Sequence, residues 1–389
     1  MLQKKERKIV DSFIKNERQE KLVKRAKELA ERFKENTARI DQDAQLPFAN
    51  IDMLKSAGFL GLAVPEEYGG EEISLYELVL VLEQLAQGDA ATALGFGWHL
   101  GVLMDIRDRR TWDEETFKSL CLQIVEQNAF LNRAQTEPET GDPTRGGVPA
   151  TTASNPNGKW ILNGKKTYTT FGDALDHIIV KATIEGTEDI ADFLVKADQE
   201  GIALEKKWDT LGMRGTRSDD LILENVEATL VETYDKERKE GLPPAWLLHI
   251  PPVYVGIALA ARKEAIEFAK SYQPNSLPHP ISEVPHIQSK IGELELELIT
   301  GRHTLYSIAK KWDEDKEKRI AMAGELFAAK HVAVNAAIKA VDLSMKIVGG
   351  RSLSKDFPFE RYYRDVRAGL HNPPVDDLTL HVLAGMALK

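Results

Sequence analysis

Residues 160–166 read Trp-Ile-Leu-Asn-Gly-Lys-Lys, a short apolar run that leads into the turn-forming pair Asn163-Gly164. Further turn signals, such as Asn157-Gly158 and Gly212, separate this run from others of the same kind. Regularly spaced short strands with such turns indicate a small β-barrel or sandwich. Strands and helices do not alternate here, so the segment is not a doubly wound dinucleotide-binding domain. The other β-rich runs are His177-Ile-Ile-Val180, Phe193-Leu-Val195 and Leu221-Ile-Leu223.

Helical periodicity appears on both sides of this β-rich segment. Ser74 with Glu77 three residues later forms a capping box at the start of a helix over 74–87. We therefore predict an α+β multidomain protein: an N-terminal helical domain (1–128), a central β-domain (129–236) and a C-terminal four-helix bundle (237–389). The remaining helices are predicted over 90–107, 114–127, 256–272, 285–312, 319–348 and 376–388.

The bulk composition excludes several classes of function. The chain has 389 residues, a formal net charge of −10 and one cysteine, Cys121. The negative charge argues against a nucleic-acid or anionic-membrane partner. One cysteine excludes an internal disulfide and a multi-thiolate metal site, and it fits a reducing compartment. Residues 1–16 do not resemble a signal peptide, and no run of eighteen apolar residues is present. We expect a cytoplasmic protein.

Five local motifs are spread over nearly the whole chain: Leu54-Lys-Ser-Ala-Gly-Phe-Leu-Gly-Leu62 with Val64-Pro-Glu-Glu-Tyr-Gly-Gly70, Ala134-Gln-Thr-Glu-Pro138, Trp160–Lys166, Leu211-Gly-Met-Arg-Gly215, and Gly349-Gly350 with Pro358 and Arg361-Tyr-Tyr-Arg-Asp365. Together these motifs resemble those of the acyl-CoA dehydrogenase superfamily of flavoproteins. The resemblance implies the fold of that superfamily, a flavin cofactor (FAD or FMN) and an oxidoreductase activity.

The resemblance also implies which residues hold the flavin. Gln135 and Thr136 would meet the pyrimidine edge of the ring, and Tyr168, Thr169 and Thr170 would pack near N5 and the ring face. The alternative is that Thr136, Thr169 and Thr170 are ordinary strand threonines. Asp142 stands where the family often has a serine that donates to the flavin pyrophosphate, which an ionised carboxylate cannot do. Gly349 and Gly350 belong to the signature near the last helices.

The chain departs from the family at the catalytic base. Desaturation of an acyl thioester needs a positioned carboxylate to take the α-proton. Ten residues after Tyr363, where most members have a glutamate, this chain has Pro373; the alternative position falls near His249. Asp376 and Asp377 lie close by as alternative bases, although their place after two prolines is typical of a helix start.

Two binding signatures are also absent. The segment Trp246-Leu-Leu-His-Ile-Pro-Pro252 is mostly apolar, where members that bind coenzyme A usually carry an acidic residue and an arginine. The stretch 272–288 contains no arginine, although a typical member has an Arg-x-x-Phe-Gly element there for the adenine half of FAD. FMN, or FAD held differently, is therefore an open alternative.

The stretch Arg367-Ala-Gly-Leu-His-Asn-Pro-Pro374 is instead similar to the reduced-flavin monooxygenases of the same superfamily, and so is Thr216-Arg-Ser-Asp-Asp220. Such an enzyme must protect a reactive flavin from water and supply protons, tasks that suit an imidazole. His371 is the leading catalytic candidate, and His99 would be a second histidine that faces the pocket. For both, a buried or surface histidine without function is the alternative.

Three functions remain open. The first is a monooxygenase-like or otherwise non-desaturating member that acts on a small apolar substrate, with a separate flavin reductase as partner. The second is an acyl-CoA dehydrogenase that passes electrons to an electron-transfer flavoprotein. The third is a flavin- or acyl-binding protein without catalysis. The long apolar C-terminal helices lead us to expect a homo-oligomer, a tetramer or a dimer.

Overall fold

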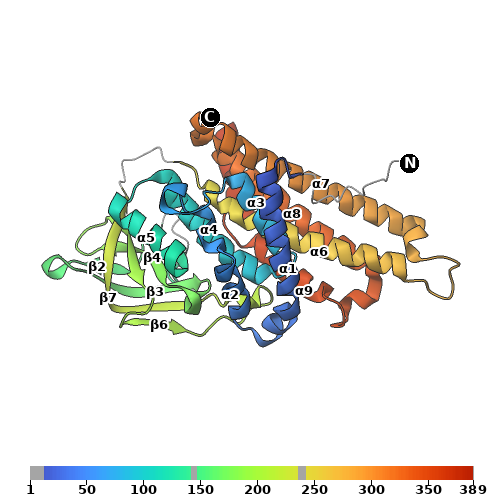
Figure 1. The fold of residues 1–389 in the computed structure, drawn as a ribbon, viewed down its shortest axis with the longest axis horizontal. Coiled ribbons are helices and arrows are strands. Elements are labelled where there is room, and N and C mark those ends of the chain that lie inside the picture. The colour runs from blue at the N-terminus through green and yellow to red at the C-terminus, as the bar shows by residue number, and fades with distance from the viewer. Residues whose placement is uncertain (1–12, 142–146, 235–241, 389) are drawn as a thin grey trace.

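The computed structural model describes residues 13–141, 147–234 and 242–388. Helices, a β-domain and a second set of helices follow one another along the chain, which confirms the predicted fold class (Figure 1). The N-terminal helices are α1 (Glu17–Asp43), α2 (Phe48–Ser56), α3 (Leu75–Leu85), α4 (Ala90–Arg109) and α5 (Glu114–Gln127). The C-terminal helices are α6 (Ile250–Ser271), α7 (Pro285–Glu314), α8 (Ala323–Val348), α9 (Phe359–Arg367) and α10 (Asp376–Ala387). The exact domain boundaries stay predictions.

The β-domain is a closed barrel with two attached strands. Pairings run β4–β2–β3–β7–β5 and return from β5 to β4, while β1 pairs with β4 and β6 pairs with β7. Closure removes the free edges that an open sheet of this size would expose. The strands are β1 (Leu131–Ala134), β2 (Thr152–Ser154), β3 (Trp160–Thr169), β4 (His177–Ile184), β5 (Ile190–Lys196), β6 (Ile202–Glu205) and β7 (Asp219–Tyr234).

The prediction of a turn at Asn163-Gly164 is wrong. Strand β3 continues through this pair, and its register with β7 shifts between Leu162 and Gly164. The reason for the glycine is close packing, because a Cβ at Gly164 would lie 2.5 Å from the Thr151 hydroxyl. The same Asn-Gly sequence thus occurs at a β-bulge here, although it is also typical of a hairpin turn. The turn predicted at Asn157-Gly158 is present, with positive φ at both residues.

Helix α3 forms the centre of the helical part and packs against α1, α6 and α7. Its eleven residues are all buried. The capping box predicted at Ser74 and Glu77 is confirmed. The carboxylate of Asp313, from α7, adds a second cap by accepting from the backbone N–H groups of Leu75 (3.0 Å) and Tyr76 (2.8 Å). The α3 start is therefore fixed from two directions.

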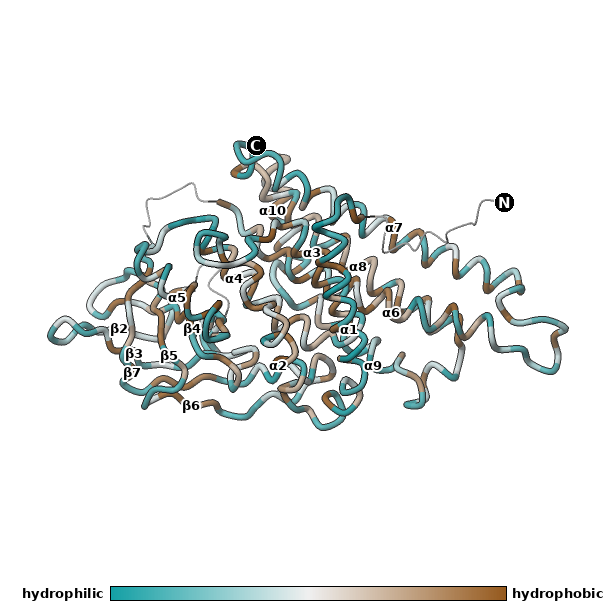
Figure 2. The backbone as a smooth tube through the Cα atoms, in the orientation of Figure 1, coloured by the Kyte–Doolittle hydropathy of each residue, from teal (hydrophilic) through white to brown (hydrophobic). Residues whose placement is uncertain are grey.

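A helix with a long apolar stretch lies inside the bundle. Residues 245–271 are long and apolar enough to cross a membrane, but 89% of the most apolar window is buried within the structure. Figure 2 shows apolar residues along the bundle helices, whereas α1 is largely hydrophilic. The hydrophobicity of α6 is explained by its position in the core.

A buried ion pair joins α3 to α7. Arg302 Nη2 donates to Glu83 Oε1 at 2.8 Å and Nε donates to Oε2 at 2.9 Å, and each side chain is 1% exposed. The Arg302 guanidinium also lies 4.5 Å from the Phe13 ring centroid. Removing one charge of such a pair leaves the other uncompensated in a medium of low polarity.

We predict that Glu83→Gln lowers the free energy of unfolding by about 3–5 kcal/mol, the usual cost of an unpaired buried charge. Urea unfolding followed by circular dichroism measures this change. The control is Glu17→Gln, which breaks the exposed Glu17–Lys21 pair and should leave the midpoint unchanged. A loss of stability in Glu83→Gln no larger than in this control would contradict the prediction.

Candidate active site

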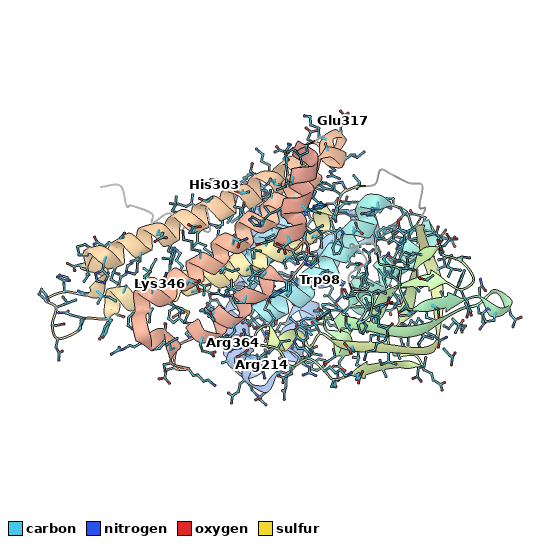
Figure 3. The ribbon with its side chains drawn as sticks, turned by 180° about the vertical axis from the view of Figure 1, so that it is seen from behind. Trp98, Arg214, His303, Glu317, Lys346 and Arg364 are labelled. Atoms are coloured by element: carbon cyan, nitrogen blue, oxygen red, sulfur yellow. The ribbon has the colours of Figure 1, made fainter. Side chains whose placement is uncertain are left out.

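A cavity of about 710 Å³ lies where the three parts of the chain meet. Its walls come from α4, from the barrel strands and the turn 208–218, and from the segment 364–378. Figure 3 shows Trp98 of α4 and Arg364 of α9 at this border between the helices and the barrel. A volume of this size is usual for a cofactor or small-ligand site.

Five of the predicted site residues line this cavity: Gln135, Thr136, Tyr168, Thr170 and His371. Thr169 does not line the cavity, and its side chain is buried elsewhere. Gly349 and Gly350 lie exposed after α8 and take no part in this wall. Asp142 lies outside the described residues.

The barrel side of the cavity is held rigidly. The Thr167 N–H donates to the Thr136 carbonyl at 2.8 Å. Next to it, Glu137 accepts from Lys166 Nζ at 2.5 Å and from the backbone N–H of Thr151 at 3.0 Å. Burial opposes ionisation of Glu137, but the Lys166 ammonium and these hydrogen bonds lower its pKa to about 2. The loop after β1 is thus fixed to the barrel by an ionised pair.

A chain of hydroxyl groups runs along the same wall. Thr216 Oγ1 donates to the Met213 carbonyl at 2.9 Å and lies 3.0 Å from Ser218 Oγ. Ser218 Oγ in turn lies 2.9 Å from Thr170 Oγ1. The Thr216 hydroxyl donates its proton to the Met213 carbonyl, so it can only accept from Ser218. Ser218 then donates to Thr216, and Thr170 donates to Ser218. The Thr170 oxygen therefore faces the cavity as an acceptor.

Aromatic side chains line the cavity on both its helical and its barrel sides. Trp98 and Trp246 line the cavity with their rings 5.8 Å apart, and Trp208 lies edge-on to the Tyr168 ring. The Arg133 guanidinium packs against the Trp246 ring, 5.7 Å from the ring centroid. Such a surface suits flat apolar groups.

Arg133 is neutralised by two carboxylates. Its Nη1 donates to Asp105 Oδ2 at 3.1 Å, and its Nε lies 3.7 Å from Asp192 Oδ2. Burial alone would lower the pKa of Arg133, but the charges of Asp192 and Asp105 raise it. The arginine is therefore a buried tie between α4 and the barrel.

The third wall, formed by the segment 364–378, presents no acidic side chain to the cavity. Among the described residues that line the cavity, none is an aspartate or a glutamate. Arg364 donates to Asp41, to Glu360 and to the Leu211 carbonyl, so its guanidinium is fully occupied. His371 lies in this wall, and its ring has no hydrogen-bond partner among the described residues. The imidazole is thus available to a ligand in the cavity.

The prediction that His99 faces the pocket is wrong. His99 is fully buried in the core, where Nε2 donates to the Leu60 carbonyl at 3.0 Å and Nδ1 accepts from the Leu131 N–H at 3.0 Å. Burial lowers its pKa to about 4, so the ring is neutral. Both nitrogens are used by the backbone, and His99 joins α4 to β1.

The alternative bases also have other partners. Asp376 accepts from Asn335 Nδ2 at 3.0 Å and lies 3.0 Å from His331 Nδ1, and both partners belong to α8. Asp377 is exposed at the first turn of α10, and neither aspartate lines the cavity. His249 is buried against Trp98 and Trp246, with a pKa lowered by burial to about 4.

Family models match residues 16–109, 132–226 and 249–370, described as the N-terminal, middle and C-terminal domains of acyl-CoA dehydrogenase. The chain is 45% identical over 380 residues to the putative acyl-CoA dehydrogenase YdbM of Bacillus subtilis, covering 97% of this chain and 99% of that protein. The chain belongs to the acyl-CoA dehydrogenase family.

Other proteins similar to this chain carry different names. A 3-(aryl)acrylate reductase of Clostridium sporogenes is 30% identical over 384 residues, covering 96% of this chain and 99% of that protein. Butyryl-CoA dehydrogenase from Megasphaera elsdenii shares the fold at a TM-score of 0.86 and 23% identity, covering 97% and 99% of the two chains. TdsC from Paenibacillus, solved with FMN and indole, shares it at 0.83 and 23%, covering 93% and 95%.

Homologues in the acyl-CoA dehydrogenase family indicate a flavin-dependent oxidoreductase. The residues of the barrel wall fit a flavin ring. The wall offers hydroxyl and amide groups at Thr136, Thr170 and Gln135, and Thr167 Oγ1 is buried there without a partner. Polar groups of this kind, set in an otherwise apolar cavity, are what orients a flat heteroaromatic ligand.

Several residues of this site were not identified from the sequence. Trp98 and Trp208 are separated by more than one hundred positions, and only the fold brings them into one cavity. Ser218 lies in the stretch 216–220, which carries the resemblance to the monooxygenases. That resemblance could have placed Ser218 in the site. Asn372 stands next to His371 and was not assigned a role.

Asp365 connects the C-terminal wall to the barrel. Its Oδ1 accepts from the Met213 N–H at 2.6 Å. Burial raises the pKa of Asp365 to about 7. Between about pH 4 and pH 7 the folded chain keeps a proton that the unfolded chain has lost. The contribution of this group to stability is therefore present below pH 4 and is lost as the pH rises through 7.

We predict that Asp365→Asn reduces the loss of stability between pH 5 and pH 8. The amide keeps an oxygen for Met213 and removes the buried charge. The effect is up to about 3 kcal/mol, because about two pKa units of the shift lie between pH 5 and pH 8. Urea unfolding of both proteins at the two pH values measures the difference. An equal pH dependence in the variant and the wild type would show that Asp365 does not titrate in this range.

Proposed function

We propose that the chain is a monooxygenase-like flavoenzyme that acts on small apolar or aromatic substrates and does not desaturate acyl thioesters. The observation that carries the proposal is the absence of aspartate and glutamate from the described walls of the cavity. Desaturation requires a base within reach of the α-carbon, usually a carboxylate. Pro373, at the position of that base, has no functional group at all.

The flavin would be held by the barrel wall. Gln135 and Thr136 would meet its pyrimidine edge, and Tyr168 and Thr170 would lie along the ring. A reduced flavin supplies two electrons for the activation of molecular oxygen. The acceptor that Thr170 presents, at the end of the hydroxyl chain, favours a ligand that carries an N–H group at that point.

His371 would manage protons on the opposite wall. Its side chain is exposed, lines the cavity and has no fixed partner, so either ring nitrogen is free to donate or accept. Trp98 and Trp246 would exclude water from the reacting groups. A separate flavin reductase is the expected partner, and a homo-oligomer is the expected assembly.

Two reactions of the purified protein test this proposal. Under anaerobic conditions a panel of saturated acyl-CoAs should leave the absorbance of the oxidised flavin unchanged, because no carboxylate takes the α-proton. With reduced flavin and ¹⁸O₂, indole and related aromatic compounds should gain one labelled oxygen, detected by mass spectrometry. Bleaching by an acyl-CoA without any labelled product would contradict the proposal.

We predict that His371→Ala lowers the yield of labelled product per reduced flavin consumed by about 100-fold, the lower range for loss of a general acid or base. His381→Ala is the matched control, since His381 is an exposed histidine on α10 that does not line the cavity. Flavin affinity, measured by fluorescence, should be the same in both variants. Equal product yields in the two variants would show that His371 has no catalytic part.

A second candidate is an ordinary acyl-CoA dehydrogenase, or its reverse as a reductase of unsaturated acids. The names of the two relatives favour it, since one is a putative acyl-CoA dehydrogenase and the other a 3-(aryl)acrylate reductase. His371 would then be the proton-transferring group, with Asp376 and Asp377 as alternatives. An electron-transfer flavoprotein would be the partner. Flavin bleaching by an acyl-CoA distinguishes this candidate from the first.

A further inference from the structure

A buried tyrosine fixes the side chain of Asn372. The Tyr254 hydroxyl, from α6, donates to Asn372 Oδ1. Tyr254 is 0% exposed, and its ring packs so closely beneath the turn 368–370 that a Cβ at Gly369 would lie 3.0 Å from it. The ring therefore has a defined position directly behind the cavity wall.

The direction of this hydrogen bond orients the amide. Burial raises the pKa of Tyr254, so its hydroxyl keeps its proton and needs an acceptor. Only Oδ1 of the amide can accept, which turns the two N–H groups of Nδ2 away from the tyrosine.

The Nδ2 donors are available to a ligand. Asn372 lines the cavity, and Nδ2 has no hydrogen-bond partner among the residues that the structure describes. Nor is Nδ2 among the polar side-chain atoms that are buried without a partner, so it reaches open space. The next two residues, Pro373 and Pro374, have no backbone N–H, which leaves this amide as the fixed donor of that stretch.

We propose that Asn372, positioned by Tyr254, is a substrate-recognition residue that donates a hydrogen bond to an oxygen acceptor on an otherwise apolar substrate. The aromatic walls take the apolar body, and the amide selects a carbonyl or a similar oxygen near it. This assignment rests on the proposed function for the identity of the cavity as the substrate site. It narrows the substrate class to small aromatic or apolar compounds that carry an acceptor oxygen.

Two probes of nearly equal shape test the proposal. Acetophenone and ethylbenzene differ by a carbonyl in place of a methylene, and calorimetry on the flavin-loaded protein gives both dissociation constants. The wild type should bind acetophenone more tightly. The selectivity ratio is the dissociation constant of ethylbenzene divided by that of acetophenone. In Asn372→Ala this ratio should fall by about 3- to 10-fold, the range for one net hydrogen bond. Asn372→Asp, which keeps the shape and loses the donors, should lower the ratio as well.

Tyr254→Phe tests the positioning step. It keeps the ring and frees the amide to rotate, so the ratio should fall, while ethylbenzene binding and the melting temperature change little. The matched control is Tyr76→Phe, since the Tyr76 hydroxyl is also buried but donates to the Phe13 carbonyl, away from the cavity. Its ratio should equal that of the wild type.

An unchanged ratio in Asn372→Ala, including the case in which both probes bind equally more weakly, would overturn the assignment. The measurement is made at equilibrium and without oxygen, so it does not depend on turnover. A protein that shows the expected ratios but gives no labelled product would contradict the monooxygenase proposal and leave the role of Asn372 intact. Labelled product together with an unchanged ratio would support the monooxygenase proposal and contradict the role of Asn372.

Discussion

The site depends on one junction, where α9 meets the turn 211–216. Arg364 joins Asp41 of α1 to the Leu211 carbonyl, and the neighbouring Asp365 accepts from the Met213 N–H. Gly212 allows this approach, since a Cβ there would lie 2.4 Å from the Arg364 carbonyl oxygen. Three parts of the chain are thereby held together at one point. The segment 368–378 leaves α9 from this junction and closes the cavity against the barrel.

The chemistry of the cavity follows from what this segment contains. It offers an imidazole and an amide, followed by two prolines, where acid–base chemistry on an acyl thioester would need a carboxylate. Acidic residues are plentiful near the site, but they lie behind the walls. Asp41, Asp105 and Asp192 each pair with an arginine, and Asp376 pairs with α8. The fold thus uses these acids to position the walls, and no carboxylate among the described residues lines the cavity.

The fold was predictable from the sequence to a large extent, because strand runs and helical periodicity are local signals. The positions of α3, α5 and the capping box at Ser74 follow from short-range patterns. The bulge at Gly164 was mistaken for a turn, because its cause is the distant Thr151. For the same reason His99 was misplaced: a histidine on a helix gives no sign of whether two backbone groups will occupy it. The roles of Tyr254 and Asn372 likewise depend on packing between segments more than one hundred residues apart.

The central claim is that no group in the cavity takes an α-proton from an acyl thioester. Proton exchange tests this more directly than turnover, because it needs no electron acceptor. The flavin-loaded protein is incubated anaerobically with butyryl-CoA in D₂O, and the thioester is then analysed by mass spectrometry. The account predicts no deuterium at the α-carbon beyond that found without protein. Protein-dependent deuterium at that carbon would contradict it, because it would show that a working base is present.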